Sequence, residues 1–97
     1  NFDAAILMGV DLQGTDLKLA NLKRADLRES NIKWADLSNA HLDSVDLQDA
    51  RVEDGWTDRL KDYVFSGKQA IQTGYEVLKD TSHRYDAGLM LRKLPQK

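Results

Sequence analysis

Hydrophobic side chains recur at every fifth position over the first half of the chain. The series is Phe2, Leu7, Leu12, Leu17, Leu22, Leu27, Ile32, Leu37, Leu42, Leu47 and Val52. A helix of 3.6 residues per turn would scatter these side chains around its axis, and a strand would send successive ones to opposite faces. A backbone that turns by about 90° every five residues keeps them together, so four segments would close a square coil of about twenty residues.

A second series, of mostly small residues, precedes these positions by two. It consists of Ala5, Val10, Thr15, Ala20, Ala25, Ser30, Ala35, Ala40, Val45 and Ala50. Two inward side chains per segment must share a narrow interior, and close packing tolerates little excess volume. The pairing of a large with a small residue therefore predicts a coil whose core is filled from both series.

The position directly before the large residue is Asp or Asn in seven of the repeats that follow Phe2. These are Asp11, Asp16, Asn21, Asp26, Asn31, Asp36 and Asp46. Such side chains bond to turn backbone and tolerate corner dihedral angles. Stacked coils would place Asp26 beside Asp46, and Asp16 beside Asp36 in the same way. Turn bonding or a bound cation would have to offset this repulsion, and we favour turn bonding.

Three five-residue segments show this pattern in full and resemble a known family. Residues 20–24 (ANLKR), 25–29 (ADLRE) and 35–39 (ADLSN) are similar to the A(D/N)LXX consensus of pentapeptide-repeat proteins. The resemblance covers about 55 residues and implies an all-β solenoid, a right-handed quadrilateral β-helix of under three coils. The sequence departs from the consensus at the Asp/Asn position, where it has Ile6, His41 and Arg51. Terminal repeats are often atypical in this way.

The five-residue register ends near residue 55, which divides one small domain into two regions. Residues 1–55 are the repeat region, and residues 56–97 are expected to form a C-terminal helical cap or flank. There Trp56, Leu60 and Val64 recur four residues apart, which predicts an amphipathic helix. A solenoid end exposes apolar core, so we expect these three side chains to cover the last coil.

Further signals predict one or two more short helices in the C-terminal region. Gly67 suits the end of the first helix, and Ser66 with Gln69 matches a capping box for a second. The second helix would carry Ala70, Ile71, Gly74, Tyr75 and Leu78 on one side. Ser82 is a candidate N-cap for a third helix, which Pro95 would end. That helix would present Tyr85, Leu89 and Leu91.

Composition excludes several classes of protein. The 97 residues contain no cysteine, which excludes disulfides and thiolate metal sites. No apolar run approaches the roughly 20 residues of a membrane span. The net charge of −2 divides into −5 for residues 1–55 (eleven acidic, six basic) and +3 for residues 56–97 (five acidic, eight basic). The basic excess is too weak to favour nucleic acid as a partner.

Three large apolar residues occupy outward slots of the expected coil: Met8, Leu19 and Trp34. They are either covered by the C-terminal helices or a further N-terminal segment, or free to contact a partner. Trp is the residue type most enriched in binding hot spots. Leu19 and Trp34 are therefore the candidate partner contacts, and both interpretations stay open.

The sequence holds no recognisable catalytic, cofactor or metal motif. It has no phosphate-binding glycine loop, no nucleophile elbow and no pair of histidines at ligand spacing. His41 and His83 have no Ser or Cys partner that spacing alone would place beside them. We therefore predict no enzymatic activity, no catalytic residue, no cofactor and no metal.

The leading hypothesis is a structural or protein–protein interaction module whose partner is another protein. Self-association through an end of the solenoid or through the C-terminal helices is a second form of that interaction. Gyrase-binding relatives suggest an alternative, a DNA-mimicking regulator of a topoisomerase such as gyrase, although five basic residues interrupt the acidic surface. These are Lys18, Lys23, Arg24, Arg28 and Lys33. A further alternative is a C-terminal spacer or cap of a longer protein, since the chain opens within the repeat register without Met.

Overall fold

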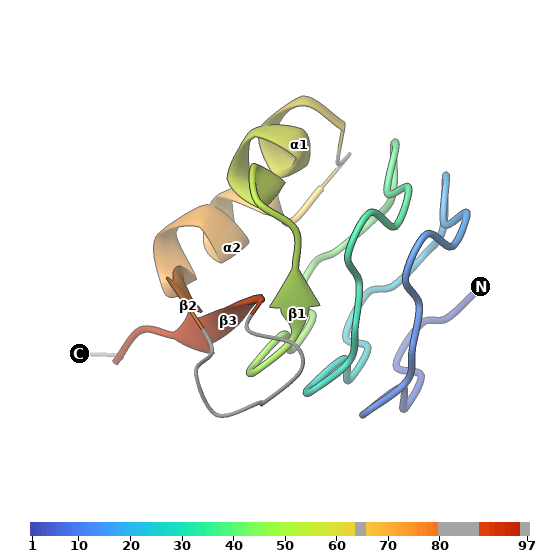
Figure 1. Ribbon diagram of the computed structural model, residues 1–97. Coiled ribbons are helices and arrows are strands. Elements are labelled where there is room, and N and C mark those ends of the chain that lie inside the picture. The colour runs from blue at the N-terminus through green and yellow to red at the C-terminus, as the bar shows by residue number, and fades with distance from the viewer. Residues whose placement is uncertain (64–65, 80–87, 96–97) are drawn as a thin grey trace.

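The computed structural model describes residues 1–63, 66–79 and 88–95. Its elements are β1 (Arg51–Val52), α1 (Trp56–Tyr63), α2 (Lys68–Gly74), β2 (Tyr75–Lys79) and β3 (Leu89–Lys93). Figure 1 shows the first fifty residues as successive layers at the N-terminal side, with both helices and the small sheet at the other side. The chain thus divides into a layered half and a half of mixed helix and strand.

Residues twenty apart lie side by side in the layered half. Parallel bridges join Ile6 to Asp26, Asp11 to Asn31, Asp16 to Asp36, Asn21 to His41, Asp26 to Asp46 and Asn31 to Arg51. Backbone hydrogen bonds run both ways between layers: the Leu7 N–H donates to the Asp26 carbonyl (2.8 Å), and the Asp26 N–H donates to the Ala5 carbonyl (2.9 Å). The twenty-residue spacing that the sequence predicts is confirmed.

A left-handed residue marks each bend. Positive φ angles fall on Ala4, Gly9, Gly14, Leu19, Arg24, Glu29, Trp34, Asn39, Ser44 and Asp49. At seven of these bends, one of the predicted Asp or Asn residues lies three positions earlier in the sequence. Its side chain accepts a hydrogen bond from the backbone N–H two residues on, at 3.0 to 3.2 Å. Their turn-bonding role is therefore confirmed.

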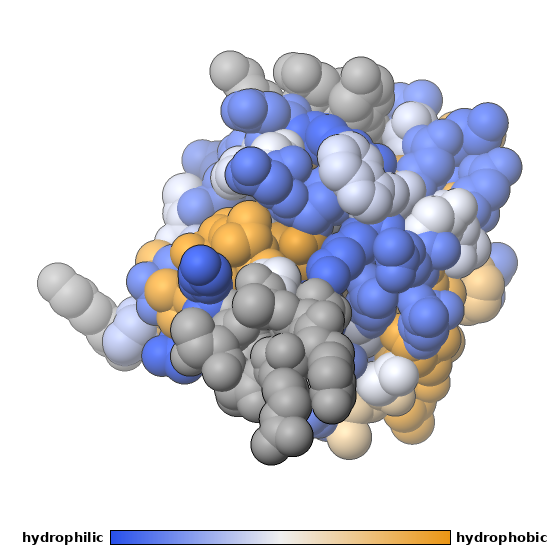
Figure 2. All heavy atoms as spheres, viewed as in Figure 1, coloured by the Kyte–Doolittle hydropathy of each residue, from blue (hydrophilic) through white to orange (hydrophobic). Residues whose placement is uncertain are grey.

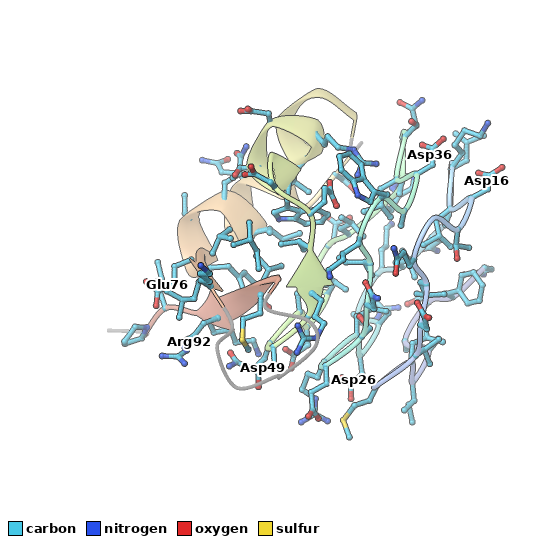
Figure 3. All side chains as sticks on the ribbon, viewed as in Figure 1. Asp16, Asp26, Asp36, Asp49, Glu76 and Arg92 are labelled. Atoms are coloured by element: carbon cyan, nitrogen blue, oxygen red, sulfur yellow. The ribbon has the colours of Figure 1, made fainter. Side chains whose placement is uncertain are left out.

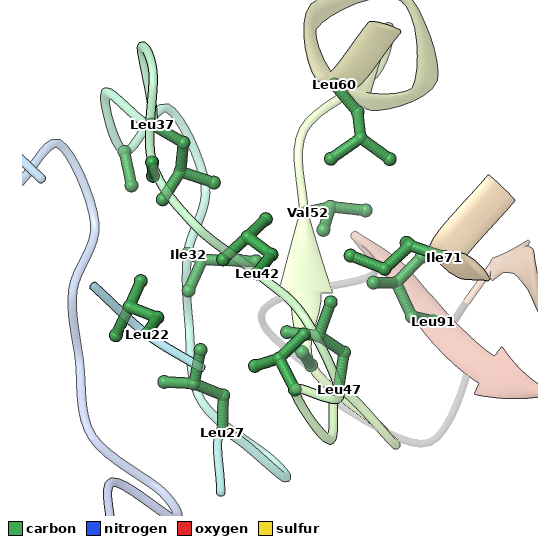
Figure 4. Close-up of a cluster of buried hydrophobic side chains, with 14 of the residues drawn as sticks. Leu22, Leu27, Ile32, Leu37, Leu42, Leu47, Val52, Leu60, Ile71 and Leu91 are labelled. Carbon is green, nitrogen blue, oxygen red and sulfur yellow. The ribbon is translucent and has the colours of Figure 1, made fainter. Parts of the chain in front are cut away.

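The large and small residues together form the core. Leu17, Leu22, Leu27, Ile32, Leu37, Leu42, Leu47 and Val52 are buried, as are Ala25, Ser30, Ala35, Ala40, Val45 and Ala50. Figure 4 shows the large members in a row that continues to Leu60, Ile71 and Leu91. The first layer is less enclosed: Leu7 and Leu12 are only partly buried, and Phe2 is 39% exposed.

The third predicted helix, which would begin after Ser82 and end at Pro95, is wrong over residues 89–93. Those residues form β3, which lies between β1 and β2 in an antiparallel sheet of order β1-β3-β2. The reason is that backbone N–H and carbonyl groups of the last layer need hydrogen-bond partners, and an extended strand can supply them. The Asp49 N–H donates to the Leu91 carbonyl, and the Leu91 N–H donates to the Ala50 carbonyl, both at 2.8 Å.

The second helix is shorter than predicted, and its start differs. It ends at Gly74, so Tyr75 and Leu78 belong to β2. The proposed capping box is wrong, because the N-cap is Gly67 in a left-handed conformation without a side-chain cap bond. Ser66 pairs instead with the last layer, where the Leu42 N–H donates to its carbonyl at 2.9 Å. The predicted N-cap Ser82 and the side chain of Tyr85 lie outside the described residues.

Candidate functional site

Leu19 and Trp34 lie on two bends of the layered half and point outward. Their exposed fractions are 73% and 59%, so neither is covered by the described C-terminal elements. Both have positive φ, 64° for Leu19 and 58° for Trp34. A left-handed conformation costs a residue with a side chain about 1–2 kcal/mol, and Gly14 occupies the equivalent bend one layer below Trp34. Because the other bends of the repeat share this conformation, Trp34 is distinguished from most of them by its large exposed apolar surface.

Two residues that follow the layered half contact Trp34, one at its backbone and one at its ring. The Glu53 carboxylate accepts a hydrogen bond from the Trp34 N–H at 2.9 Å. Its other oxygen accepts one from the Arg59 guanidinium of α1, which also donates to the Ala35 carbonyl at 2.6 Å. The guanidinium carbon lies 5.5 Å from the centre of the indole ring, within the range of a cation–π contact. Glu53 is only 4% exposed, so this cluster is a fixed support.

An open groove runs beside Trp34. Trp34, Asp36, Ser38 and Arg59 line it. One Asp36 carboxylate oxygen accepts hydrogen bonds from the Ser38 N–H (3.1 Å) and hydroxyl (2.6 Å), which lower the pKa of that carboxyl. Asp36 consequently stays ionised at neutral pH, and the groove combines one aromatic surface with fixed polar groups.

The same wall connects Trp34 with Leu19. The Leu19 N–H donates to the Ser38 carbonyl at 2.9 Å, so the bend at Leu19 is bonded to a groove residue. Asp16 and Asp36 are bridged neighbours on this wall, and Figure 3 shows both at its outer edge. We call Leu19, Trp34, Asp36, Ser38 and Arg59 the Trp34 face. Trp34 thus lines the groove itself, while Leu19 is bonded through its backbone to the groove residue Ser38.

Sequence analysis missed Glu53 and Arg59. Glu53 falls at an outward slot of the repeat, where an exposed residue is expected. Arg59 is a single basic residue of the predicted first helix, and no spacing rule relates it to Trp34. Only the way α1 packs on the layers brings these three residues together, so no local signal could have revealed the cluster.

Trp56 and Leu60 are 3% and 1% exposed and belong to the same core cluster as Val52, Ile71 and Leu91. Val64, the third predicted cap residue, lies outside the described residues. The structure also adds Tyr75, whose hydroxyl oxygen accepts a hydrogen bond from the Leu47 N–H at 2.9 Å. Burial raises the pKa of that half-buried hydroxyl.

Basic side chains separate the stacked carboxylates that the sequence places side by side. Arg28 pairs with Asp26 at 2.7 Å and approaches Asp46 at 3.9 Å, and Lys93 of β3 pairs with Asp46 at 3.0 Å. The hydrogen bond from Arg28 lowers the pKa of Asp26 from 3.8 to about 2. These carboxylates therefore form alternating ion pairs along the stack.

One group in the structure superficially resembles a catalytic constellation. The Ser66 hydroxyl donates to Asp43 at 2.6 Å and lies 3.2 Å from Nδ1 of His41, a contact that spacing did not predict. Since the single hydroxyl hydrogen goes to the carboxylate, His41 is not placed to remove it and activate the oxygen. The three residues instead attach the Ser66 segment to the last layer.

The described residues contain no group of three or more His, Asp or Glu side chains placed to hold a metal ion. Within the same residues, no helix has the length and apolar character needed to cross a membrane.

The comparison with protein families gave one match. The model of pentapeptide repeats matches residues 5–43 with eight copies, so this segment belongs to the pentapeptide-repeat family. Repeats of this kind imply a β-helix-type solenoid and suggest a structural or protein-interaction module, and proteins that carry them are generally non-enzymatic. No curated protein and no solved structure matched the chain.

Proposed function

We propose that this chain is a non-enzymatic protein-interaction module that docks another protein through the Trp34 face. The observation that carries the proposal is Trp34 itself. It is 59% exposed at its bend, where the buried Glu53 carboxylate accepts a hydrogen bond from its backbone N–H and the Arg59 guanidinium lies against its indole ring. An aromatic side chain fixed before binding loses little conformational entropy on association, which favours affinity.

The proposed scaffold for this surface is a right-handed quadrilateral β-helix of under three coils. We infer that the C-terminal region, residues 56–97, closes its last coil, with Trp56 and Leu60 as the central cap residues. The burial of Trp56 and Leu60 supports that role. A closed scaffold would keep the Trp34 face rigid, because the Arg59 support is part of the same helix as Leu60.

The gyrase-directed alternative is not proposed. A DNA mimic requires a row of unpaired carboxylates, but Asp3 pairs with Arg24 at 2.6 Å, Asp26 with Arg28 and Asp46 with Lys93. The spacer alternative stays a prediction of the sequence.

The test compares proteins captured by purified wild-type chain with those captured by two variants. Trp34→Ala removes the aromatic surface, and Met8→Ala is the matched control, because Met8 is also exposed (49%) but lies at another part of the repeat region. We expect a protein that wild type and Met8→Ala retain to be reduced at least tenfold by Trp34→Ala. Retention of the same proteins by all three chains would remove Trp34 from the proposed interface.

A further inference from the structure

The groove beside Trp34 contains a carboxylate with one oxygen available to a ligand. Both hydrogen bonds that Asp36 accepts, from the Ser38 N–H (3.1 Å) and the Ser38 hydroxyl (2.6 Å), go to the same oxygen. Among the residues that the structure describes, no donor reaches the other oxygen of Asp36. An ionised carboxylate offers both of its oxygens as acceptors, so this second oxygen can accept a hydrogen bond from a molecule that enters the groove.

The charges around the groove favour a cation as that ligand. The charge of Arg59 is offset by its ion pair with Glu53, whose side chain is 2% exposed. Asp16, the bridged neighbour of Asp36, lies 3.9 Å from Lys18, which is longer than the roughly 2.7–2.9 Å of a charge-assisted hydrogen bond. Two carboxylates on this wall are therefore only weakly compensated, and a surface of one sign attracts a ligand of the opposite sign.

Trp34 adds apolar surface to the same groove. The residue is 59% exposed although Arg59 lies against its ring. Figure 2 shows mostly hydrophilic atoms over α1 and the neighbouring ends of the layers, so the apolar surface on this side is limited in extent. A ligand that matches such a groove has an apolar stem of modest length and a positively charged end. Lysine is a side chain of this kind, because its methylene groups pack on apolar surface while its ammonium group stays polar.

We propose that the groove binds a lysine side chain of the partner protein. Its ammonium group would donate to the available oxygen of Asp36, and its methylene groups would lie against Trp34. Arginine fits less well, because a guanidinium pairs most strongly with both oxygens of a carboxylate, and Ser38 already bonds one of them twice. This inference rests on the proposed docking through the Trp34 face and names the chemistry of its ligand.

The test is an NMR titration of the isotope-labelled 97-residue chain with four capped tripeptides that differ only in the central residue. These residues are lysine, arginine, norleucine, which has an apolar stem without the charge, and glutamate. The indole N–H of Trp34 reports binding, and the Trp34→Ala spectrum assigns its signal. The indole N–H of Trp56, which is 3% exposed, is the internal reference. We expect the lysine peptide to shift the Trp34 signal most and the Trp56 signal to stay in place.

Asp36→Asn tests the proposed contact with the ammonium group. Asn21 and Asn31 hold the same slot in other repeats and accept the same turn hydrogen bond, so this replacement should leave the fold intact. We expect it to weaken binding of the lysine peptide about threefold, as for loss of an exposed ion pair. Asp11→Asn is the matched control, because it removes one carboxylate from the same slot on another wall. It should bind the lysine peptide as wild type does.

Equal shifts of the Trp34 signal with the lysine and norleucine peptides would overturn the proposal. So would an unchanged affinity for Asp36→Asn, or a larger shift with the glutamate peptide, which would assign recognition to Arg59. These outcomes are distinct from failure of the docking surface itself. A protein that wild type captures and Trp34→Ala loses would still support docking through the Trp34 face after lysine recognition had failed.

Discussion

At each end of the layered half, the terminal layer has backbone groups that face no further layer. The two ends differ in whether these groups find hydrogen-bond partners. At the C-terminal end, three free N–H groups of the last layer find acceptors in the sequence that follows. Leu42 donates to the Ser66 carbonyl, Leu47 to the Tyr75 hydroxyl and Asp49 to the Leu91 carbonyl. At the N-terminal end, the backbone groups of Ile6, Asp11 and Asp16 have no such partner among the described residues.

Side-chain burial follows the same division. Leu42 and Leu47, at the C-terminal end, are 2% and 1% exposed, while Phe2 at the other end is 39% exposed. A repeat can satisfy only those groups that face another repeat, because its stability comes from neighbouring units. Sequence outside the repeat must therefore provide what the terminal layer lacks, and in this chain residues 66–79 and 88–95 provide it at one end.

The largest expected effect comes from Gly67→Ala. The Cβ would lie 2.5 Å from the Leu42 carbonyl carbon, and the residue has φ of 85°. Overpacking costs about 1–3 kcal/mol and a left-handed conformation about 1–2 kcal/mol, so we expect a loss of about 4 kcal/mol in unfolding free energy. Urea denaturation monitored by tryptophan fluorescence measures it, since Trp56 lies in the covered end.

Gly14→Ala is the matched control, because Gly14 also has positive φ but a Cβ there meets nothing within 4 Å. Its expected cost is the conformational part alone, about 1 kcal/mol. Equal losses for the two variants would show that contact between Gly67 and the last layer adds nothing to stability.

A smaller difference is expected between apolar truncations at the two ends. Leu60→Ala would open a cavity beside Val52 in the covered end, at a cost of about 3 kcal/mol. Leu7→Ala, in the partly buried first layer, should cost about 1 kcal/mol, because part of the side chain is already in water. Thermal and urea unfolding of both variants measure the difference. A loss for Leu7→Ala as large as for Leu60→Ala would mean that the first layer is also covered in solution.

How much the sequence predicts also differs between the two halves. The spacing of Leu22 and Leu42 and the bonds made by Asp11 and Asp46 are repeated local features, and the repeat amplifies each of them. The strand at Leu89–Lys93 is not repeated, and its apolar residues suit a short helix equally well. Backbone pairing with Asp49 and Ala50 decides between helix and strand there, and that pairing is long-range.

The residues of the candidate site also differ in whether the sequence identifies them. Leu19 and Trp34 are identifiable because they break the polar pattern of outward slots. Their support is not, because Arg59 reaches Trp34 from a separate helix and Glu53 is an outward residue that α1 buries. Position within the repeat thus predicts which side chains point outward, while tertiary packing determines which of them are covered, as Glu53 is.

The smallest expected effect concerns the ion pairs that run along the stack toward β3. Asp26 and Arg28 carry them in the second layer, whereas Ile6 and Met8 hold the equivalent slots of the first. The pKa of Asp26 is about 2 in the folded chain, below its ordinary value of 3.8. A carboxylate with a lowered pKa stabilises the fold above its ordinary pKa, and that contribution falls away as pH drops through 3.8 toward 2.

The unfolding free energy of Asp26→Asn should therefore fall less steeply than that of wild type over this interval. Asp16→Asn is the control for loss of a carboxylate at the same repeat slot, because Asp16 lies 3.9 Å from Lys18, whereas Asp26 lies 2.7 Å from Arg28. Urea denaturation at several values between about pH 5 and pH 2 measures the slopes, and the same slope for Asp26→Asn and wild type would contradict a stabilising role for the Asp26–Arg28 pair.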